Sequence, residues 1–256
     1  MIDDIKKSLE EGKLRDKLNL CTDDKGVKVF PVRRIITAGD DICFVTEGRI
    51  GIECARIFIE KLTQNDRKNC VDNKNYSACA GVAIVHQKYP FYRAYELAEM
   101  LCSRAKKEGA KISPSDDGRG VSLIDWHIEF GEIKDSLEDI DADYIAEDGN
   151  KLSLRPYIVA GKQEILNSDK KKKYETFVRN LKKIIDNENA ISVGKIKELR
   201  SVMKKGEIAT NNYLKFYKMR DLIDAEFVGE LFTEEKSVKV NAFFDAIEVM
   251  DNYLFV

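Results

Sequence analysis

Two adjacent carboxylates, Asp40 and Asp41, stand between two short apolar runs and are well suited to metal chemistry. Runs rich in β-branched residues flank Ala38-Gly39-Asp40-Asp41, which predicts a β-hairpin whose turn presents the aspartates. Gly39 suits a tight turn because glycine adopts positive φ without a steric cost. Neighbouring carboxylates repel each other, and Mg²⁺ shared with phosphates would relieve that repulsion. These residues alone leave open the alternative of a solvated acidic turn.

A second pair of chemically capable side chains, Asp125 and His127, is expected on one strand. Because side chains alternate along a strand, the two would share a face and Trp126 would lie on the other. A catalytic or metal-binding role is one interpretation of the pair. The favoured interpretation is a hydrogen-bonded structural pair.

The composition is that of a globular protein with little net charge. The chain has 256 residues, 34% charged and 43% hydrophobic, and a formal net charge of −2. This balance argues against a general nucleic-acid coat protein. No apolar run reaches the roughly 20 residues of a membrane helix, and residues 1–7 lack the apolar core of a signal peptide. We therefore expect a cytoplasmic protein with no membrane partner.

The cysteines predict neither a disulfide framework nor a zinc site. Their sequence contexts are mostly apolar, no Cys-x-x-Cys pair occurs, and the chain has only two histidines. We therefore expect reduced, buried thiols. The six positions are Cys21, Cys43, Cys54, Cys70, Cys79 and Cys102.

Apolar periodicity predicts the elements that must position these side chains. The expected strands cover residues 27–37, 42–46, 77–86, 121–130 and 152–159. The expected helices of the first part cover residues 2–18, 50–62, 92–107 and 132–144. Gly109 is expected to end the third of these helices. The small apolar residues of 77–86 predict a central strand covered on both faces.

This order predicts an α+β fold that contains most of a ferredoxin-like layer, an antiparallel sheet with helices on one face. A full βαββαβ unit begins with a strand before its first helix, and residues 1–26 offer none. From residue 161 onward, helical patterns include 192–204, 208–223 and 238–254 and predict a bundle. The predicted domains are therefore 1–160 and 161–256.

Three segments, in this order and spacing, resemble the palm domain of the large polymerase-like subunit of type III CRISPR effector complexes. That subunit is a relative of the GGDEF diguanylate cyclases. The segments are residues 36–44 (ITAGDDICF), 78–85 (ACAGVAIV) and 89–99 (YPFYRAYELAE), the last continuing to Ala105-Lys106-Lys107. The family's hallmark is a Gly-Gly-Asp-Asp hairpin, and here Ala38 replaces the first glycine. The resemblance covers residues 27–130.

The resemblance implies nucleotidyl transfer. In such palms, the hairpin carboxylates and an Asp on the first strand bind two divalent cations, Mg²⁺ or Mn²⁺, which stabilise the attacking and leaving oxygens. Family members join ATP into cyclic oligoadenylates or form cyclic di-GMP. Carried onto this chain, Asp40 and Asp41 are the catalytic, metal-binding residues. The nucleotide-binding positions are Ala38, Gly39, Lys106 and Lys107.

The chain departs from the family where the first palm strand should stand. Residues 1–18 correspond to the end of the first palm helix, so the chain is expected to be part of a longer protein, to pair with another chain, or to be a degenerate palm. Two hypotheses follow. One is an ATP- and metal-binding nucleotidyltransferase of antiviral defence or signalling, completed by another segment. The other is a catalytically inactive palm that serves as an interaction or nucleotide-sensing subunit of a larger complex. For either hypothesis, the expected partners are a nucleotide triphosphate and another chain or segment that completes the palm, a CRISPR ribonucleoprotein being one candidate.

Overall fold

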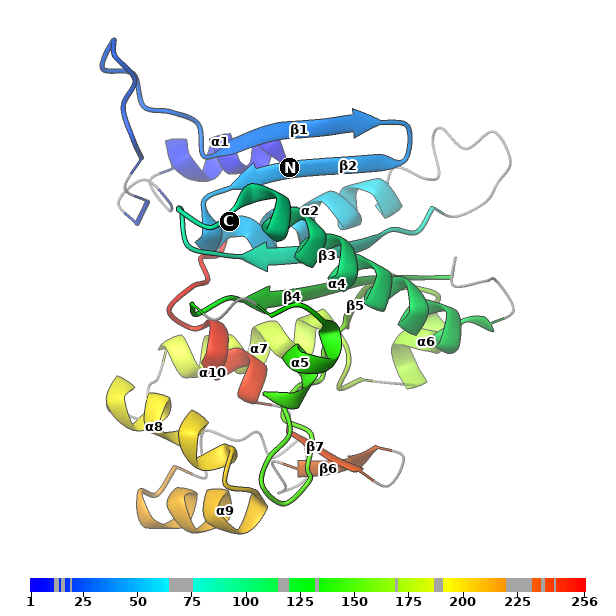
Figure 1. Ribbon diagram of the computed structural model, residues 1–256, viewed down its shortest axis with the longest axis vertical. Helices are drawn as coiled ribbons and strands as arrows, with labels where there is room; N and C mark the ends of the chain where they lie inside the picture. Colours follow the sequence, from blue (N-terminus) through cyan, green and yellow to red (C-terminus); the bar gives the residue numbers. More distant parts are fainter. Residues whose placement is uncertain are drawn as a thin grey trace.

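The chain forms an α+β fold, which confirms the predicted fold class (Figure 1). The structure is a computed structural model, and it describes residues 1–11, 14, 17–18, 20–64, 76–114, 120–131, 134–168, 170–186, 191–219, 232–235, 238–241 and 243–256.

The strands are β1 (Val32–Ala38), β2 (Asp41–Thr46), β3 (Cys79–Ile84), β4 (Val121–Ile128), β5 (Tyr157–Gly161), β6 (Phe232–Glu235) and β7 (Val238–Asn241). The helices are α1 (Ile2–Glu10), α2 (Gly51–Gln64), α4 (Phe91–Ile112), α5 (Leu137–Ala142), α6 (Gln163–Ser168), α7 (Tyr174–Asp186), α8 (Val193–Met203), α9 (Glu207–Phe216) and α10 (Phe244–Val249). A short 3₁₀ turn, η1 (Gly48–Ile50), leads into α2.

The described strands form three small sheets. β1 and β2 form an antiparallel hairpin, β3, β4 and β5 form a three-stranded sheet in that order, and β6 pairs with β7. β3 and β4 are parallel, whereas β4 and β5 are antiparallel. The prediction of a purely antiparallel sheet is therefore wrong. The reason is that α4, 22 residues long, carries the chain back along the sheet, so β4 starts at the same end as β3 and runs parallel to it.

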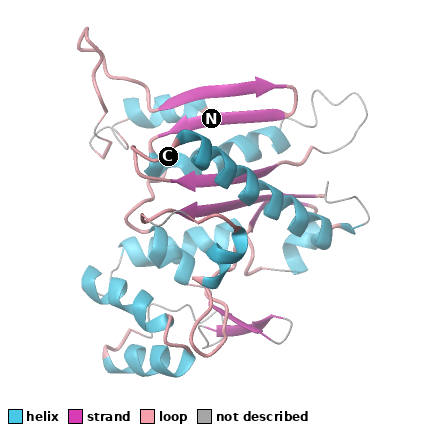
Figure 2. Ribbon diagram, viewed as in Figure 1, coloured by secondary structure: helices cyan, strands magenta, loops and turns pink. Residues whose placement is uncertain are grey.

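Helices cover both faces of the three-stranded sheet, not one face as predicted (Figures 1 and 2). On one face, Arg104 of α4 pairs with Asp125 of β4. On the other face, the Trp126 ring lies 4.8 Å from that of Phe177 on α7. The apolar core extends from Ile52 on α2 to residues of α10, so side chains on both sides of residue 160, the predicted boundary, contribute to it.

Several predicted elements change their bounds or type. α4 continues through Gly109, because that glycine is buried against its neighbours and the helix needs no glycine stop there. The acidic helix predicted at 132–144 shortens to α5, and β5 begins only at Tyr157. The segment 238–254, predicted as one helix, instead forms strand β7 followed by helix α10. β3 is an edge strand of its sheet rather than a central one.

The thiols are only partly as predicted. The five described cysteines are free, but only Cys54 is buried and Cys21 is exposed. Cys70 lies outside the described residues.

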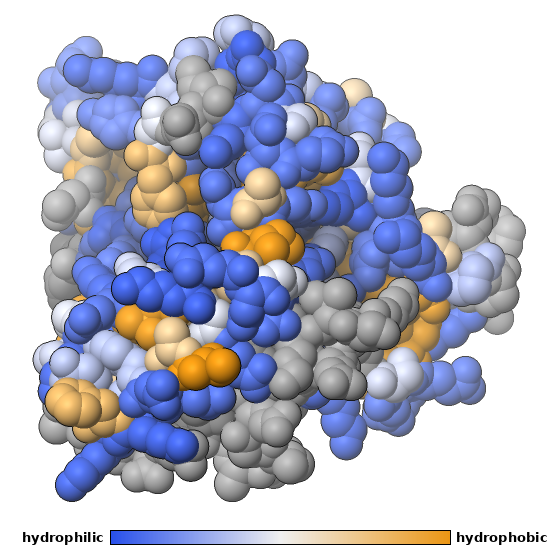
Figure 3. Space-filling view, turned by 60° about the horizontal axis from the view of Figure 1, so that its bottom comes forward, coloured by the Kyte–Doolittle hydropathy of each residue, from blue (hydrophilic) through white to orange (hydrophobic). Residues whose placement is uncertain are grey.

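The molecular face in Figure 3 is mainly hydrophilic, with apolar side chains in small separate groups. Among the described helices, none is both long enough and apolar enough to cross a membrane.

Gly81 sets the distance between α4 and β3. A Cβ atom at this position would lie 2.5 Å from the backbone nitrogen of Cys102, and it would also overlap the carbonyl oxygen of Ala98. Only glycine therefore allows the helix and the strand to approach this closely.

We expect Gly81→Ala to lower the free energy of unfolding by about 1–3 kcal/mol, because the added methyl group must displace helix backbone. Denaturant unfolding measures the change. Gly194→Ala on α8 is the control, since a Cβ there meets nothing within 4 Å. Equal midpoints for Gly81→Ala and wild type would contradict the close approach.

Candidate functional site

The β1–β2 turn carries the predicted site residues. Ala38 and Asp41 pair across the hairpin, so Gly39 and Asp40 form a two-residue turn, with Gly39 at φ +65°. All four residues are exposed. A side chain at Gly39 would meet no atom within 4 Å. The predicted hairpin is confirmed, and its turn is open to a ligand.

Acidic groups of β2 and α4 lie near each other. The Tyr95 hydroxyl donates to Glu99 Oε1 at 2.7 Å on α4. This hydrogen bond is the main reason that the pKa of Tyr95 is raised, and the charge of Asp41 adds to it. Partial burial and then the charge of Glu99 raise the pKa of Cys43 on β2. Asp41 and Glu99 therefore act on a shared region between the hairpin and α4.

The two lysines assigned by the resemblance lie on α4. Lys106 and Lys107 are exposed, and the Lys106 charge acts on the Cys79 and Cys102 thiols. This places Lys106 near the start of β3. Within the described ranges, no ion pair joins either lysine to the hairpin aspartates. The structure thus groups the four turn residues but does not link the lysines to them.

The turn fits one cation shared with phosphates better than it fits a complete two-metal site. Mg²⁺ in proteins is commonly held by one or two carboxylates together with substrate phosphates and water. Asp40 and Asp41 supply that number of carboxylates. Among the described residues, no group of three or more His, Cys, Asp or Glu side chains could hold a metal ion.

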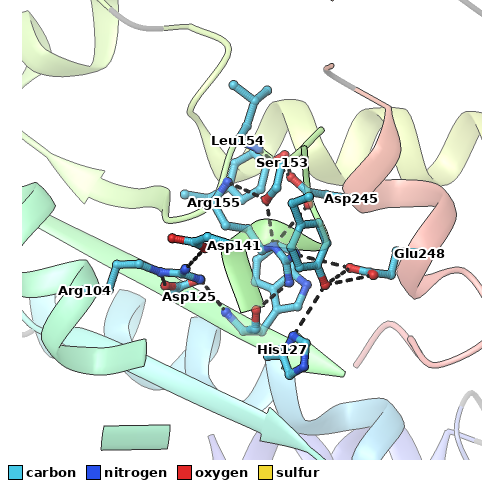
Figure 4. Close-up of polar contacts among 12 residues, drawn as sticks. Arg104, Asp125, His127, Asp141, Ser153, Leu154, Arg155, Asp245 and Glu248 are labelled. Carbon is cyan, nitrogen blue, oxygen red and sulfur yellow. Dashed lines mark hydrogen bonds and ion pairs between the residues drawn. The ribbon is translucent and has the colours of Figure 1, made fainter. Parts of the chain in front are cut away.

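A buried ionic network around Arg155, absent from the sequence predictions, lies between β4 and α10 (Figure 4). The residue is 5% exposed. Its Nε lies 2.9 Å from Ser153 Oγ and 3.1 Å from Asp245 Oδ1. Its Nη2 lies 3.3 Å from Glu248 Oε2. The available signal was the i,i+3 pair of carboxylates, Asp245 and Glu248, inside an otherwise apolar helix.

Two tyrosines extend this network. The Tyr144 hydroxyl donates to Glu248 Oε1 at 2.9 Å, and the Tyr157 hydroxyl donates to Asp245 Oδ2 at 2.8 Å. Each carboxylate of α10 therefore accepts at least one hydrogen bond, and Asp245 Oδ1 is compensated only by its ion pair with Arg155. Buried charges require such partners.

Asp125 and His127 share a face of β4 but do not form the predicted pair. Arg104 Nε donates to Asp125 Oδ2 at 2.6 Å. His127 Nδ1 instead lies 3.4 Å from the Tyr144 hydroxyl. Burial lowers the pKa of His127 to about 4, so its imidazole is neutral at pH 7.

A cavity of about 190 Å³ opens beside His127. Four of its charged lining residues form two pairs: Arg200 Nη2 lies 3.2 Å from Glu248 Oε1, and Lys134 Nζ lies 3.2 Å from Asp143 Oδ2. These pairs suit a structural role for the cavity walls.

No protein-family model matches the chain, and a search of curated proteins finds no similar sequence.

Replacing Arg155 by methionine should lower the free energy of unfolding by about 3–5 kcal/mol, because Asp245 would then be buried without a cation and Glu248 would keep only Arg200. Denaturant unfolding checks this expectation. Arg33→Met, at an exposed position on β1, is the control and should change stability little. Similar losses in both variants would contradict the role of the buried network.

His127 predicts a pH dependence of stability. Its pKa falls from 6.5 to about 4 on folding, so its contribution is complete above pH 6.5 and is lost as the pH falls from 6.5 to about 4. The full contribution is about 3 kcal/mol. His127→Gln should therefore be more destabilising at about pH 7.5 than at about pH 4.5, as measured by urea unfolding.

The exposed His86 provides the control, because His86→Gln removes an imidazole that is not buried and should change the free energy of unfolding little at about pH 7.5. A pH-independent effect of His127→Gln would contradict the burial of a neutral imidazole.

Proposed function

We propose that the chain is a palm-like subunit, related to the large polymerase-like subunit of type III CRISPR effector complexes, that binds a divalent cation and ATP at the β1–β2 turn. In this role it is a nucleotide-sensing or interaction subunit of a larger complex. The observation that carries the proposal is the open, exposed turn that presents Asp40 and Asp41 beside Gly39.

The order of elements supports the proposal. The hairpin is followed by α2, β3, α4 and β4, the order that the palm resemblance implies for residues 27–130. The helices α7 to α10 are consistent with the helical bundle predicted from residue 161 onward. The finer fold proposed is therefore a ferredoxin-like palm followed by that bundle, with β6 and β7 inserted among the helices.

The turn can do one part of the family's chemistry. Its two carboxylates can hold one Mg²⁺ or Mn²⁺ jointly with a triphosphate, and a bound cation would offset the repulsion between Asp40 and Asp41. Exposed glycine backbone at position 39 lets a phosphate approach closely. A cation held there supplies charge neutralisation of the triphosphate.

A second candidate is an active nucleotidyltransferase that forms cyclic oligonucleotides. The region shared by Asp41 of β2 and Glu99 of α4 favours it, because a further carboxylate brought there would add to the acidic ligands that two-metal catalysis needs. Turnover then depends on a carboxylate supplied by another segment or chain.

Mg²⁺–ATP should raise the melting temperature of the wild-type chain and leave that of an Asp40→Ala/Asp41→Ala variant unchanged. At about ten times its Kd, a ligand stabilises the folded state by about 1.4 kcal/mol. Differential scanning fluorimetry with ATP, with and without Mg²⁺, measures the shift. Asp24→Ala, in another exposed acidic turn, is the control and should keep the full response.

The same samples separate the two candidates. Chromatography of ATP after incubation with Mn²⁺ should show no product from the chain alone if it is a sensing subunit. An ATP-derived product that disappears in the double variant would favour the transferase. An ATP response that survives the double variant would refute the proposed site.

A further inference from the structure

Two unpaired strand edges face each other in this molecule. Going down Figure 1, β1, β2, β3 and β4 follow one another, and the arrows of β2 and β3 point the same way. Within the described strands, β2 is hydrogen-bonded only to β1, and β3 only to β4. The edge of β2 that faces β3, and the edge of β3 that faces β2, therefore lack a strand partner in the described chain.

The backbone groups on these edges have a defined direction. The Ile84 carbonyl accepts from Glu129 N–H at 2.9 Å, so Ile84 and, by alternation, Val82 direct their backbone groups toward β4. Gly81 and Ala83 then direct theirs toward the opposite, unpaired edge. In agreement, the Cys79 carbonyl on that edge accepts a hydrogen bond from the Cys102 thiol instead of a strand N–H. On β2, Asp41 closes the two-residue turn with Ala38, which directs the backbone groups of Ile42 outward.

The two helices that cover this region bridge both edges. On one side, α4 carries Glu99, whose charge acts on Cys43 of β2, and the same helix touches β3 at Gly81. On the other side, Cys54 of α2 packs in one apolar cluster with Phe44 of β2, and Ile52 of α2 packs in the main core with Ile84 of β3. A segment placed between the edges would thus be covered on both faces.

The side chains of β2 and β3 are also of the kind found next to a further strand. The β3 sequence, Cys79–Ile84, has the small apolar composition of a strand inside a sheet, yet only Ile84 is buried. On β2, Ile42 is 42% exposed and Val45 is 44% exposed. Apolar side chains at an exposed, unpaired edge are a known liability unless another strand covers them.

The charges indicate which side chains would face α4. Asp41 and Glu99 are both exposed, and in the described part of the chain no cation pairs with either. A basic side chain between them would gain attraction from both carboxylates. On the other face, the apolar residues of α2 favour apolar side chains.

We propose that the edges of β2 and β3 bind one extended segment of a partner polypeptide, which pairs with both strands and joins the two sheets into one. The segment runs antiparallel to both strands and alternates apolar residues toward α2 with Lys or Arg toward Asp41 and Glu99. Strands β2 and β3 run in the same direction and are connected through helix α2, with one strand position left between them (Figure 1). This is the split βαβ arrangement. Recognition is by β-strand addition, in which backbone hydrogen bonds give affinity and alternate side chains give specificity.

The proposed partner is a protein strand, and the amide exchange that reports its binding does not depend on nucleotide. Backbone amides report the pairing directly, so the proposed nucleotide site can fail while the partner strand is confirmed, and the reverse also holds.

Amide hydrogen exchange of the isolated chain is the first test. The amides of Ile42 and Ala83 should exchange faster than those of Val82 and Ile84, because only the latter two are held by β4. Equal, slow exchange at all four amides would show that the edges are already paired and would overturn the proposal. If amide exchange slows only as the chain concentration rises, the occupant is a second copy of this chain, and the proposal of a partner strand is overturned.

The second test supplies a strand. The segment Lys-Val-Thr-Val-Lys-Val-Thr is fused ahead of Met1 through a Gly/Ser linker of about 20 residues, which gives a high local concentration. It should slow exchange at Ile42 and Ala83 by about tenfold or more, since these amides would exchange only through local opening. Unchanged exchange at these amides would overturn the proposal.

Two matched fusions complete the design. The same segment with proline in place of each valine cannot donate those ladder hydrogen bonds and should give no protection. The segment with glutamate in place of each lysine should protect less, because it faces Asp41 and Glu99. Equal protection by the proline fusion would overturn backbone pairing, and stronger protection by the glutamate fusion would overturn the predicted basic face.

Discussion

The buried guanidinium of Arg155 links three distant parts of the chain. It donates hydrogen bonds to the Trp126 carbonyl of β4 and to Ser153 Oγ, and it forms ion pairs with the carboxylates of α10. A buried charge is tolerated only when its partners are present. Strand β4 and helix α10 must therefore be in place together, although more than a hundred residues separate them. This constraint fixes helix α10 against the three-stranded sheet of β3, β4 and β5.

The sequence predicted those parts of the fold that depend on neighbouring residues. The β1–β2 hairpin follows from two apolar runs around Gly39-Asp40, and α2 follows from its apolar spacing. What could not be predicted depends on contacts across the chain. The parallel pairing of β3 with β4, the edge position of β3 and the persistence of α4 through Gly109 are all set by packing between distant elements.

The same distinction applies to the candidate site. The position of Asp40 and Asp41 on an open turn was predictable, because turn geometry is local. The neighbourhood of Glu99 and Tyr95 was not predicted, since it depends on how α4 crosses β2. The assignment of Lys106 stays a prediction: its charge acts on thiols at the start of β3, and within the described residues no ion pair links it to the turn.

The close contact at Gly81 has a mechanical consequence. Helix α4 is 22 residues long, which corresponds to about 33 Å, and Gly81 meets it near its middle, at Ala98 and Cys102. Backbone touches backbone there, so the contact can act as a fulcrum. Tilting the Tyr95 end toward or away from β2 would move the Glu108 end in the opposite direction. There Glu108 holds Lys172 at 2.6 Å, so an event at the hairpin would be felt at the segment that leads into α7.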